Sequence, residues 1–274
     1  MKGTIIKAVS NHYTVLVGEE SYLCEGRGKL KHDKVKPKVG DMVQLDEEHR
    51  ILKIFPRKNE LIRPMIANVD QAYVITSTKH PNLDLYLLDK MLLLIQSHGI
   101  EPIICFTKID LLSEAEKKDI ILLKEYYEKI GYQVCTNEEM EKIKKTFQNK
   151  IGVFTGQTGA GKSTLLNRID PKLHLATNEI SYALNRGKNT TTHVELLKLC
   201  GGWIADSPGF SDIDLHLTKE EIEKNMPEFR DYKSNCQYRD CTHSHEVDCE
   251  VKRQVEKKTI LKSRYEHYLK FISR

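Results

Sequence analysis

The sequence lacks long hydrophobic runs. Nowhere in its 274 residues do about eighteen consecutive apolar residues occur, the length that a helix needs to cross a bilayer. The first residues also lack the apolar core of a secretory signal peptide. We therefore expect a soluble, cytoplasmic protein with no membrane partner.

Cysteine and net charge are also scarce. The seven cysteines are an odd number, and four of them are isolated in the sequence, which argues against a disulfide framework. The net charge of +4 is too small to indicate nucleic-acid binding by itself, so only local basic clusters can support such binding. Internal repeats and low-complexity tracts are absent, and the length allows two or three domains.

A glycine-rich motif occurs in the middle of the chain. Residues 156–163 fit the phosphate-binding P-loop pattern G-x-x-x-x-G-K-[ST], between an apolar run at 150–154 and a helical pattern from Thr164. We expect Lys162 to reach the β- and γ-phosphates and the Ser163 hydroxyl to bind Mg²⁺. The expected nucleotide contacts in this segment are Gly156, Gln157, Thr158, Gly159, Ala160, Gly161, Lys162, Ser163 and Thr164.

A second motif, Thr107-Lys108-Ile109-Asp110, follows the apolar run 103–106 and so lies at the carboxyl end of an expected strand. Asp110 can accept hydrogen bonds from N1–H and the amino group of guanine, and the aliphatic stem of Lys108 can lie along the base. Adenine lacks those donors, so the pair favours guanine. A surface loop with a helix N-cap is the alternative interpretation of this motif.

Two further segments complete the expected site. Asp206, at the end of an apolar strand, can hold Mg²⁺ through water, and the N–H group of Gly209 can contact a γ-phosphate. A threonine of 190–192, which we assign to Thr191, can complete the Mg²⁺ shell. The expected catalytic residues are Lys162, Thr191, Asp206 and Gly209. The threonine triplet can alternatively be the start of a β-branched strand.

The order of these motifs is a circular permutation of the usual GTPase order. Because of this motif order, the chain resembles the ribosome small subunit-dependent GTPase A family of bacterial 30S assembly factors. The resemblance extends over nearly the full length of the chain. The resemblance implies a multidomain monomer with an OB-type β-barrel and linker (1–66), a permuted α/β GTPase (67–212) and a mainly α zinc-binding domain (213–274). It also implies GTP and GDP as ligands, and the 30S subunit with its 16S rRNA as partner.

Strands that alternate with helices support a parallel sheet in the central unit. We expect strands at 69–76, 103–106, 132–135 and 151–154, and helices at 84–98, about 113–130 and 138–149. Ser113 and Glu116 form a capping-box pattern at the start of the second helix.

The chain departs from the family pattern near the base and near the expected catalytic water. Thr107 stands in place of the commoner asparagine, so we expect the side-chain link between the base loop and the P-loop to be absent. Cys135-Thr136-Asn137 replaces the second base-contacting loop, and whether Cys135 and Thr136 touch the base stays open. Phe210 occupies the position of the glutamine that orients water in Ras-like enzymes, which leaves Asn189, His193 or a partner for that role.

The N-terminal segment contains five short β-rich runs, which suit an OB-type barrel. A basic segment within it comprises Arg27, Lys29, Lys31, Lys34, Lys36 and Lys38. OB barrels commonly bind oligonucleotides with such loops, although a solvated charged loop explains the charges equally well.

Near the C-terminus, Cys236-x4-Cys241-x-His243-x5-Cys249 offers the ligands of one tetrahedral Cys₃His zinc site. His245 is the rival ligand, and the family pattern favours His243. Beyond it, apolar residues from Val251 to Ile272 mark one face of an expected terminal helix. The other faces are basic and include Lys262, Arg264 and Lys270, which suits either RNA contact or plain solvation.

The motifs predict a GTPase, and the family resemblance implies that it docks on the small ribosomal subunit, hydrolyses GTP and is then released. The alternative, suggested by Phe210 and Asn189, is a nucleotide-gated RNA-binding module with negligible turnover. An ATP-dependent kinase or pump is disfavoured by Asp110.

Overall fold

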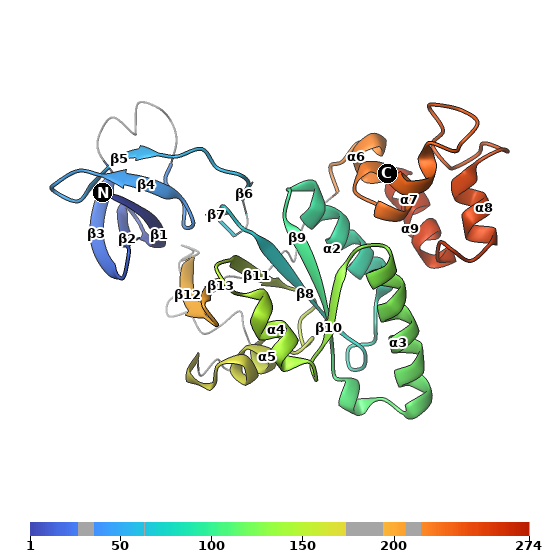
Figure 1. Cartoon of the computed structure of the whole chain (residues 1–274), viewed down its shortest axis with the longest axis horizontal. Coiled ribbons are helices and arrows are strands. Elements are labelled where there is room, and N and C mark those ends of the chain that lie inside the picture. The colour runs from blue at the N-terminus through green and yellow to red at the C-terminus, as the bar shows by residue number, and fades with distance from the viewer. Residues whose placement is uncertain (27–35, 63, 174–193, 207–214, 274) are drawn as a thin grey trace.

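The computed structural model describes residues 1–26, 36–62, 64–173, 194–206 and 215–273. A β-barrel lies at one end of the molecule, a helical region at the other, and an α/β unit between them (Figure 1). In these ranges no helix has the length and apolar character to span a bilayer.

The N-terminal unit is a barrel of five strands, as predicted. They are β1 (Lys2–Val9), β2 (His12–Val17), β3 (Glu20–Gly26), β4 (Met42–Leu45) and β5 (Arg50–Ile54). β1 pairs with both β2 and β4, and β3 runs parallel to β5, so the sheet closes on itself. Alternate residues point inward, which buries the side chains of Ile5, Val15, Val43 and Ile51 completely.

The central sheet has the order β10-β9-β8-β11-β13-β12. Its strands are β8 (Gln71–Ser77), β9 (Glu101–Thr107), β10 (Gln133–Thr136), β11 (Ile151–Thr155), β12 (Glu195–Leu199) and β13 (Gly202–Asp206). All neighbours pair in parallel except β12, which is antiparallel to β13. β8 and β9 are buried along nearly their whole length, as expected of strands covered on both faces.

Helices follow the strands of this sheet. They are α2 (Leu85–Ser97), α3 (Glu114–Lys129), α4 (Met140–Thr146) and α5 (Lys162–Ile169), with short 3₁₀ turns at η1 (Ile109–Leu111) and η2 (Pro171–Leu173). The predicted capping box is present, since Ser113 accepts from the Glu116 backbone and Glu116 accepts from that of Ser113. α4 is shorter than the predicted 138–149. The Glu139 N–H donates to the carbonyl of Thr136, so residues 138–139 belong to the turn after β10, and the left-handed backbone of Asn149 (φ 57°) cannot continue the helix.

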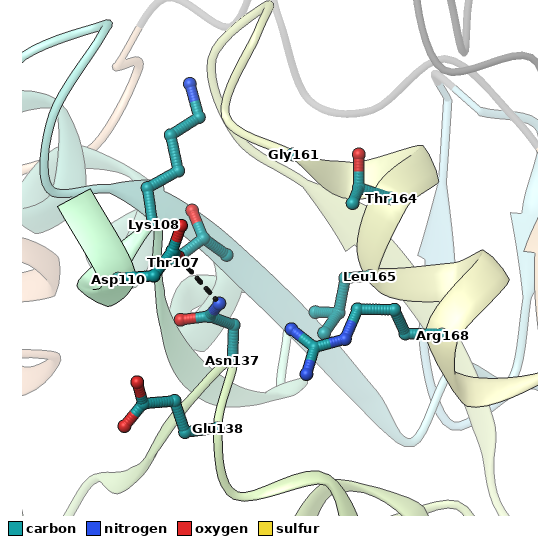
Figure 2. A pocket seen from close by; sticks show the side chains of 9 residues that line it. All are labelled: Thr107, Lys108, Asp110, Asn137, Glu138, Gly161, Thr164, Leu165 and Arg168. Atoms are coloured by element: carbon teal, nitrogen blue, oxygen red, sulfur yellow. Dashed lines mark hydrogen bonds between the residues drawn. The ribbon is translucent and has the colours of Figure 1, made fainter.

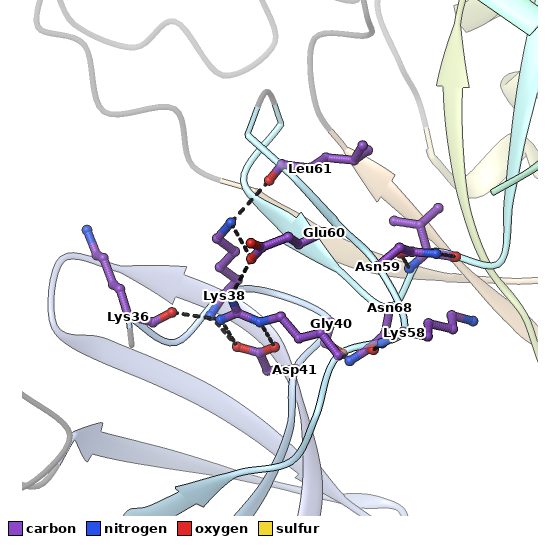
Figure 3. Close-up of polar contacts among 11 residues, drawn as sticks. Lys36, Lys38, Gly40, Asp41, Lys58, Asn59, Glu60, Leu61 and Asn68 are labelled. Atoms are coloured by element: carbon purple, nitrogen blue, oxygen red, sulfur yellow. Dashed lines mark hydrogen bonds and ion pairs between the residues drawn. The ribbon is translucent and has the colours of Figure 1, made fainter. Parts of the chain in front are cut away.

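The linker between the barrel and the central unit is bonded to both, since on the central side the Asn59 amide donates to the carbonyl of Val69 at 2.8 Å and Lys58 pairs with Asp70. It contains the hairpin β6 (Glu60–Leu61) and β7 (Ile66–Ala67). The guanidinium of Arg57 donates to both carboxylate oxygens of the buried Asp41, at 2.7 and 2.8 Å. The Asn68 amide donates to the carbonyl of Gly40 (Figure 3). The linker is therefore a fixed connection rather than a free tether.

A second connection is made by strand pairing. β1 of the barrel lies antiparallel to β12 of the central sheet, with Lys7 opposite Glu195. Their side chains form an ion pair with 2.8 Å between Nζ and Oε2. The strands of both units thus form one continuous hydrogen-bonded sheet.

The C-terminal region contains α6 (Lys219–Lys224), α7 (Pro227–Lys233), α8 (Glu250–Glu256) and α9 (Lys262–Ile272). The prediction of one helix from Val251 to Ile272 is wrong. Lys258 adopts φ +60°, and the N–H groups of Thr259 and Ile260 both donate to the carbonyl of Gln254, which ends α8. The turn buries the Ile260 side chain completely, and that burial favours the break.

Arg264 was predicted on the basic, exposed side of this helix, and that prediction is also wrong. Its side chain is 2% exposed and donates to Asp89 of α2 at 2.7 Å and to Glu228 of α7 at 2.6 and 3.0 Å. Burial opposes ionisation of Asp89, yet Arg264 and His267 lower its pKa below the usual value. This buried cluster holds α9 against the central unit.

Candidate nucleotide-binding site and metal centre

The P-loop connects β11 to α5, as the sequence predicts. Gly156 has φ 137°, and a Cβ atom there would lie 2.1 Å from the carbonyl oxygen of Ile75, so only glycine fits. Gly161, with φ 94°, occupies the N-cap position of α5. This geometry turns backbone N–H groups and the positive end of the helix toward the inside of the loop, which makes it an anion-binding site.

The ammonium group of Lys162 lies within this loop. It donates to the carbonyls of Gly156 and Gln157 at 2.7 and 2.8 Å. Burial lowers the pKa of Lys162 to about 8. Ser163 follows it, with only 4% of its surface exposed. Both side chains named as phosphate and Mg²⁺ contacts therefore belong to the first turn of α5.

The base motif lies beside the P-loop, because β9 and β11 are both neighbours of β8. The Thr107 hydroxyl donates a 2.6 Å hydrogen bond to the carbonyl of Ala160. The expectation that replacing asparagine by threonine removes the link between the two loops is therefore wrong. The threonine side chain is shorter than that of asparagine, but the backbones of the base motif and the P-loop are close enough for its hydroxyl to reach Ala160 directly.

A cavity of about 330 Å³ opens between the base motif and α5 (Figure 2), within the rough 300–1,000 Å³ range of small-ligand sites. It is lined by Thr107, Lys108, Asp110, Asn137, Glu138, Gly161, Thr164, Leu165 and Arg168. Lys108 has a left-handed backbone (φ 61°), and its ammonium donates to the carbonyl of His80. The Asn137 amide donates to Asp110 at 3.5 Å.

The cavity lining bears on the segment 135–137, which was expected in place of the second base-contacting loop. Cys135 is 2% exposed, and its thiol faces the carbonyl of Ile104 within the sheet. Asn137 and Glu138 line the cavity instead. Glu138 and Arg168 were not assigned from the sequence, whereas Asn137 belongs to the segment 135–137 that was expected in place of the second base-contacting loop. The position of Glu138, two residues after the strand next to β9, was the signal that could have identified it.

The remaining predicted residues are only partly covered by the structure. Thr190, Thr191, Thr192, Asn189 and His193 lie outside the described residues. Gly209 and Phe210 lie outside them as well.

The backbone of Asp206 ends β13, directly after Ala205, which pairs with Val153 of β11. Both strands run in the same direction, so the chain reaches Asp206 beside the strand that enters the P-loop.

The four residues of the candidate metal centre converge in the C-terminal region. The ligand atoms of Cys236, Cys241, His243 and Cys249 all lie within 4.8 Å of one another. Nδ1 of His243 is 3.6, 3.4 and 3.3 Å from the three sulfur atoms in that order. A tetrahedral site with Zn–S bonds of about 2.3 Å and Zn–N bonds of about 2.1 Å needs separations of roughly 3.6 Å. The cluster is therefore consistent with zinc.

His243 rather than His245 belongs to this cluster. Its side chain is fully buried, its Nε2 lies 3.6 Å from Glu223, and its carbonyl accepts a hydrogen bond from the Tyr265 hydroxyl. Such outer contacts orient a metal-bound imidazole. His245 contacts the hydroxyl of its neighbour Ser244.

Comparison with known proteins gives two family matches. A family model described as RsgA GTPase matches residues 54–216, and one described as RsgA N-terminal domain matches residues 2–50. The chain is 46% identical to the small ribosomal subunit biogenesis GTPase RsgA of Enterococcus faecalis, over 99% of this chain and 94% of that relative. It is 45% identical to the protein of the same name from Bacillus velezensis, over 99% and 96% of the two chains.

Solved structures give the same relationship. The crystal structure of YloQ, described as a circularly permuted GTPase, matches with a TM-score of 0.85 and 37% identity, over 99% of this chain and 93% of that one. YjeQ from Thermotoga maritima matches with a TM-score of 0.86 and 34% identity, over 99% and 97% of the two chains.

Proposed function

The chain belongs to the RsgA family of circularly permuted GTPases, and from this membership we propose that it acts late in assembly of the small (30S) ribosomal subunit. It is a GTP hydrolase. In the proposed cycle it binds the subunit with GTP, hydrolyses GTP to GDP and phosphate at a rate raised by the subunit, and leaves. It does so as a monomer in the cytoplasm.

One observation supports this proposal most strongly. The base cavity and the P-loop meet at the carboxyl edge of the parallel strands of the central sheet. The Thr107–Ala160 hydrogen bond joins them, although the base motif precedes the P-loop in the sequence, which is the permuted order. Ligands of open α/β sheets bind at this edge. Asp110 would read the guanine base while Lys162 neutralises the phosphates.

Magnesium would be held by Ser163, Thr191 and Asp206. The buried Ser163 hydroxyl at the start of α5 and the end of β13 beside β11 suit this assignment. The ion would supply positive charge to the phosphates during transfer. The chain itself would bind and orient the nucleotide through backbone N–H groups of the P-loop and, as expected from the sequence, of Gly209. Because Phe210 cannot hydrogen-bond water, we propose that the ribosomal subunit completes the positioning of the attacking water.

The flanking units would provide contacts to 16S rRNA and structural support. The barrel resembles modules that bind oligonucleotides, and the basic residues of 27–36 would offer phosphate contacts. Lys38 was expected among them, but its ammonium pairs with Glu60 and its side chain is only 16% exposed. One structural zinc, bound by Cys236, Cys241, His243 and Cys249, would stabilise a helical unit too small to depend on its apolar core alone. We propose unit boundaries at 66/67 and 212/213.

The deciding experiment is steady-state GTP hydrolysis with and without 30S subunits, at low salt where a binding assay confirms the complex. We expect stimulation on the order of 10³-fold or more, as for other partner-completed GTPase sites. Large (50S) subunits and the Lys162→Ala variant serve as controls and should give no stimulation. Equal rates with and without bound 30S subunits would instead support a nucleotide-gated RNA-binding module.

A second arm tests the RNA contact. Charge reversal at Lys29, Lys31 and Lys34, which lie outside the described residues, should weaken 30S binding and leave basal hydrolysis unchanged. Binding of the wild-type chain should also weaken steeply with salt, because lysine–phosphate contacts release counterions.

A further inference from the structure

Arg168 lies on the wall of the base cavity opposite the base motif. It belongs to α5 and lines the cavity together with Thr164 and Leu165. Thr164 and Arg168 are four residues apart, so their side chains lie on the same face of the helix. Figure 2 shows the guanidinium directed toward the side of the cavity that holds Asp110 and Asn137.

A guanine base in this cavity needs more than one polar partner. Its N1–H and amino group are donors, which the Asp110 carboxylate accepts in the proposed function. Its other polar edge carries two acceptors, O6 and N7, which need donors from the protein. A base bound through Asp110 alone would leave both acceptors without a direct partner.

Three of the lining side chains carry nitrogen donors, namely Lys108, Asn137 and Arg168. The Lys108 ammonium donates to the carbonyl of His80, and the Asn137 amide donates to Asp110. The Arg168 side chain is exposed and makes no hydrogen bond or ion pair within the described part of the chain. Of these three side chains it is therefore the one whose donors are all without a partner in the described part of the chain, whereas Lys108 and Asn137 each already use one donor.

Arginine also matches the chemistry of that edge. Its planar fork donates two parallel hydrogen bonds, and pairing with O6 and N7 is the commonest specific arginine contact to guanine in nucleic acids. Adenine presents an amino donor in place of O6, which repels the guanidinium. We infer that Arg168 binds O6 and N7 of the guanine base and is a second specificity-determining residue of this site. The inference rests on the proposed function, in which the ligand is a guanine nucleotide.

The test measures equilibrium binding of GDP, 7-deaza-GDP and inosine diphosphate to three proteins. 7-deaza-GDP lacks the N7 acceptor, and inosine diphosphate lacks the amino group that Asp110 would read. The proteins are the wild type, Arg168→Met and Lys172→Met. Methionine keeps the unbranched stem and the helix propensity of arginine. Lys172 is an exposed cation four residues further on, outside the cavity, and controls for a general charge effect.

We expect the wild type and Lys172→Met to bind 7-deaza-GDP about tenfold more weakly than GDP. Arg168→Met should bind GDP about tenfold or more weakly than the wild type, and should bind GDP and 7-deaza-GDP equally. If Arg168→Met retains the full preference for GDP over 7-deaza-GDP, or binds GDP like the wild type, the inference is wrong.

Inosine diphosphate separates this inference from the function on which it rests. Both the wild type and Arg168→Met should bind it more weakly than GDP, because Asp110 is intact in each. If the wild type binds inosine diphosphate and GDP equally, the Asp110 assignment fails, whatever the outcome with 7-deaza-GDP.

Discussion

The hydroxyl of Thr107 and the carbonyl of Ala160 form a 2.6 Å hydrogen bond between the base motif and the P-loop. The bond is buried and joins residues 53 positions apart in the sequence. It fixes the loop that we propose to read the base relative to the loop that we propose to bind the phosphates. A nucleotide that bridges both loops therefore meets a preorganised site, which lowers the entropic cost of binding.

Replacing Thr107 by valine should weaken GDP binding by roughly fivefold to tenfold. The change preserves shape but leaves the Ala160 carbonyl without its partner, at a cost of about 1 kcal/mol or more. Thr107→Ser keeps the hydroxyl and is the matched control. Calorimetric titration of both variants checks this expectation, and equal affinity of the valine variant and the wild type would contradict it.

Asp110→Asn should exchange guanine for xanthine preference. The amide offers a donor to the C2 carbonyl of xanthine, while the loss of a charge-assisted pair to guanine costs about 1.5–3 kcal/mol. Competition between GDP and xanthosine diphosphate measures the change. Glu138→Gln neutralises another carboxylate of the same cavity and should leave the preference for guanine intact. Unchanged GDP affinity in Asp110→Asn would remove this residue from the base site.

GDP affinity should depend on pH through Lys162, whose pKa burial lowers to about 8. Below that pH the ammonium is already charged, so it needs no proton when phosphates bind. Above it, binding must take up a proton, and affinity should fall by up to about tenfold per pH unit. Titrations between about pH 7 and 9 test this, with Lys162→Ala as the control that keeps every other titrating group. The same slope in both proteins would contradict the assignment.

Metal analysis should find one zinc per chain in protein purified without chelator. Cys249→Ser should lose the metal and destabilise the C-terminal region, while GDP binding persists because the P-loop lies elsewhere in the fold. Cys200→Ser, at a cysteine outside the cluster, is the control and should retain zinc. Full zinc content in both Cys249→Ser and Cys236→Ser would rule out this ligand set.

Arg264→Met should destabilise the protein by about 3–5 kcal/mol, because it leaves Asp89 and Glu228 buried without their cation. Urea unfolding followed by circular dichroism measures the effect. Arg253→Met removes an arginine that is 47% exposed and should cost less than about 1 kcal/mol. Adding Asp89→Asn and Glu228→Gln to Arg264→Met should restore part of the loss. If Arg264→Met is no less stable than Arg253→Met, the cluster does not hold α9 in place.

The local motifs could be predicted from the sequence because their chemistry is encoded in adjacent residues. The P-loop glycines, the Ser113 capping box and the cysteine–histidine spacing each specify a short segment. The permuted α/β sheet and the five-stranded barrel followed from periodicity and from the family resemblance, and both are confirmed.

The errors have a common physical origin in tertiary contacts. Arg264 was predicted to be exposed to solvent because arginine usually is. Its partner Asp89 is 175 positions away in the sequence, and no local pattern indicates that the two residues pair. The Thr107 hydroxyl reaches Ala160 only because β9, β8 and β11 are neighbours in the sheet. The break between α8 and α9 contains neither proline nor glycine, and burial of Ile260 favours it instead.

The pairing of β1 with β12 makes the GTPase unit dependent on the barrel at one edge of its sheet. β12 would otherwise be the outermost strand of the central sheet, with one row of backbone groups unpaired. Such exposed edges recruit strands from other molecules and promote aggregation. The barrel pairs with this edge at Glu195, where β12 begins, so a GTPase unit freed of its N-terminal strands should self-associate at concentrations where the full chain stays monodisperse.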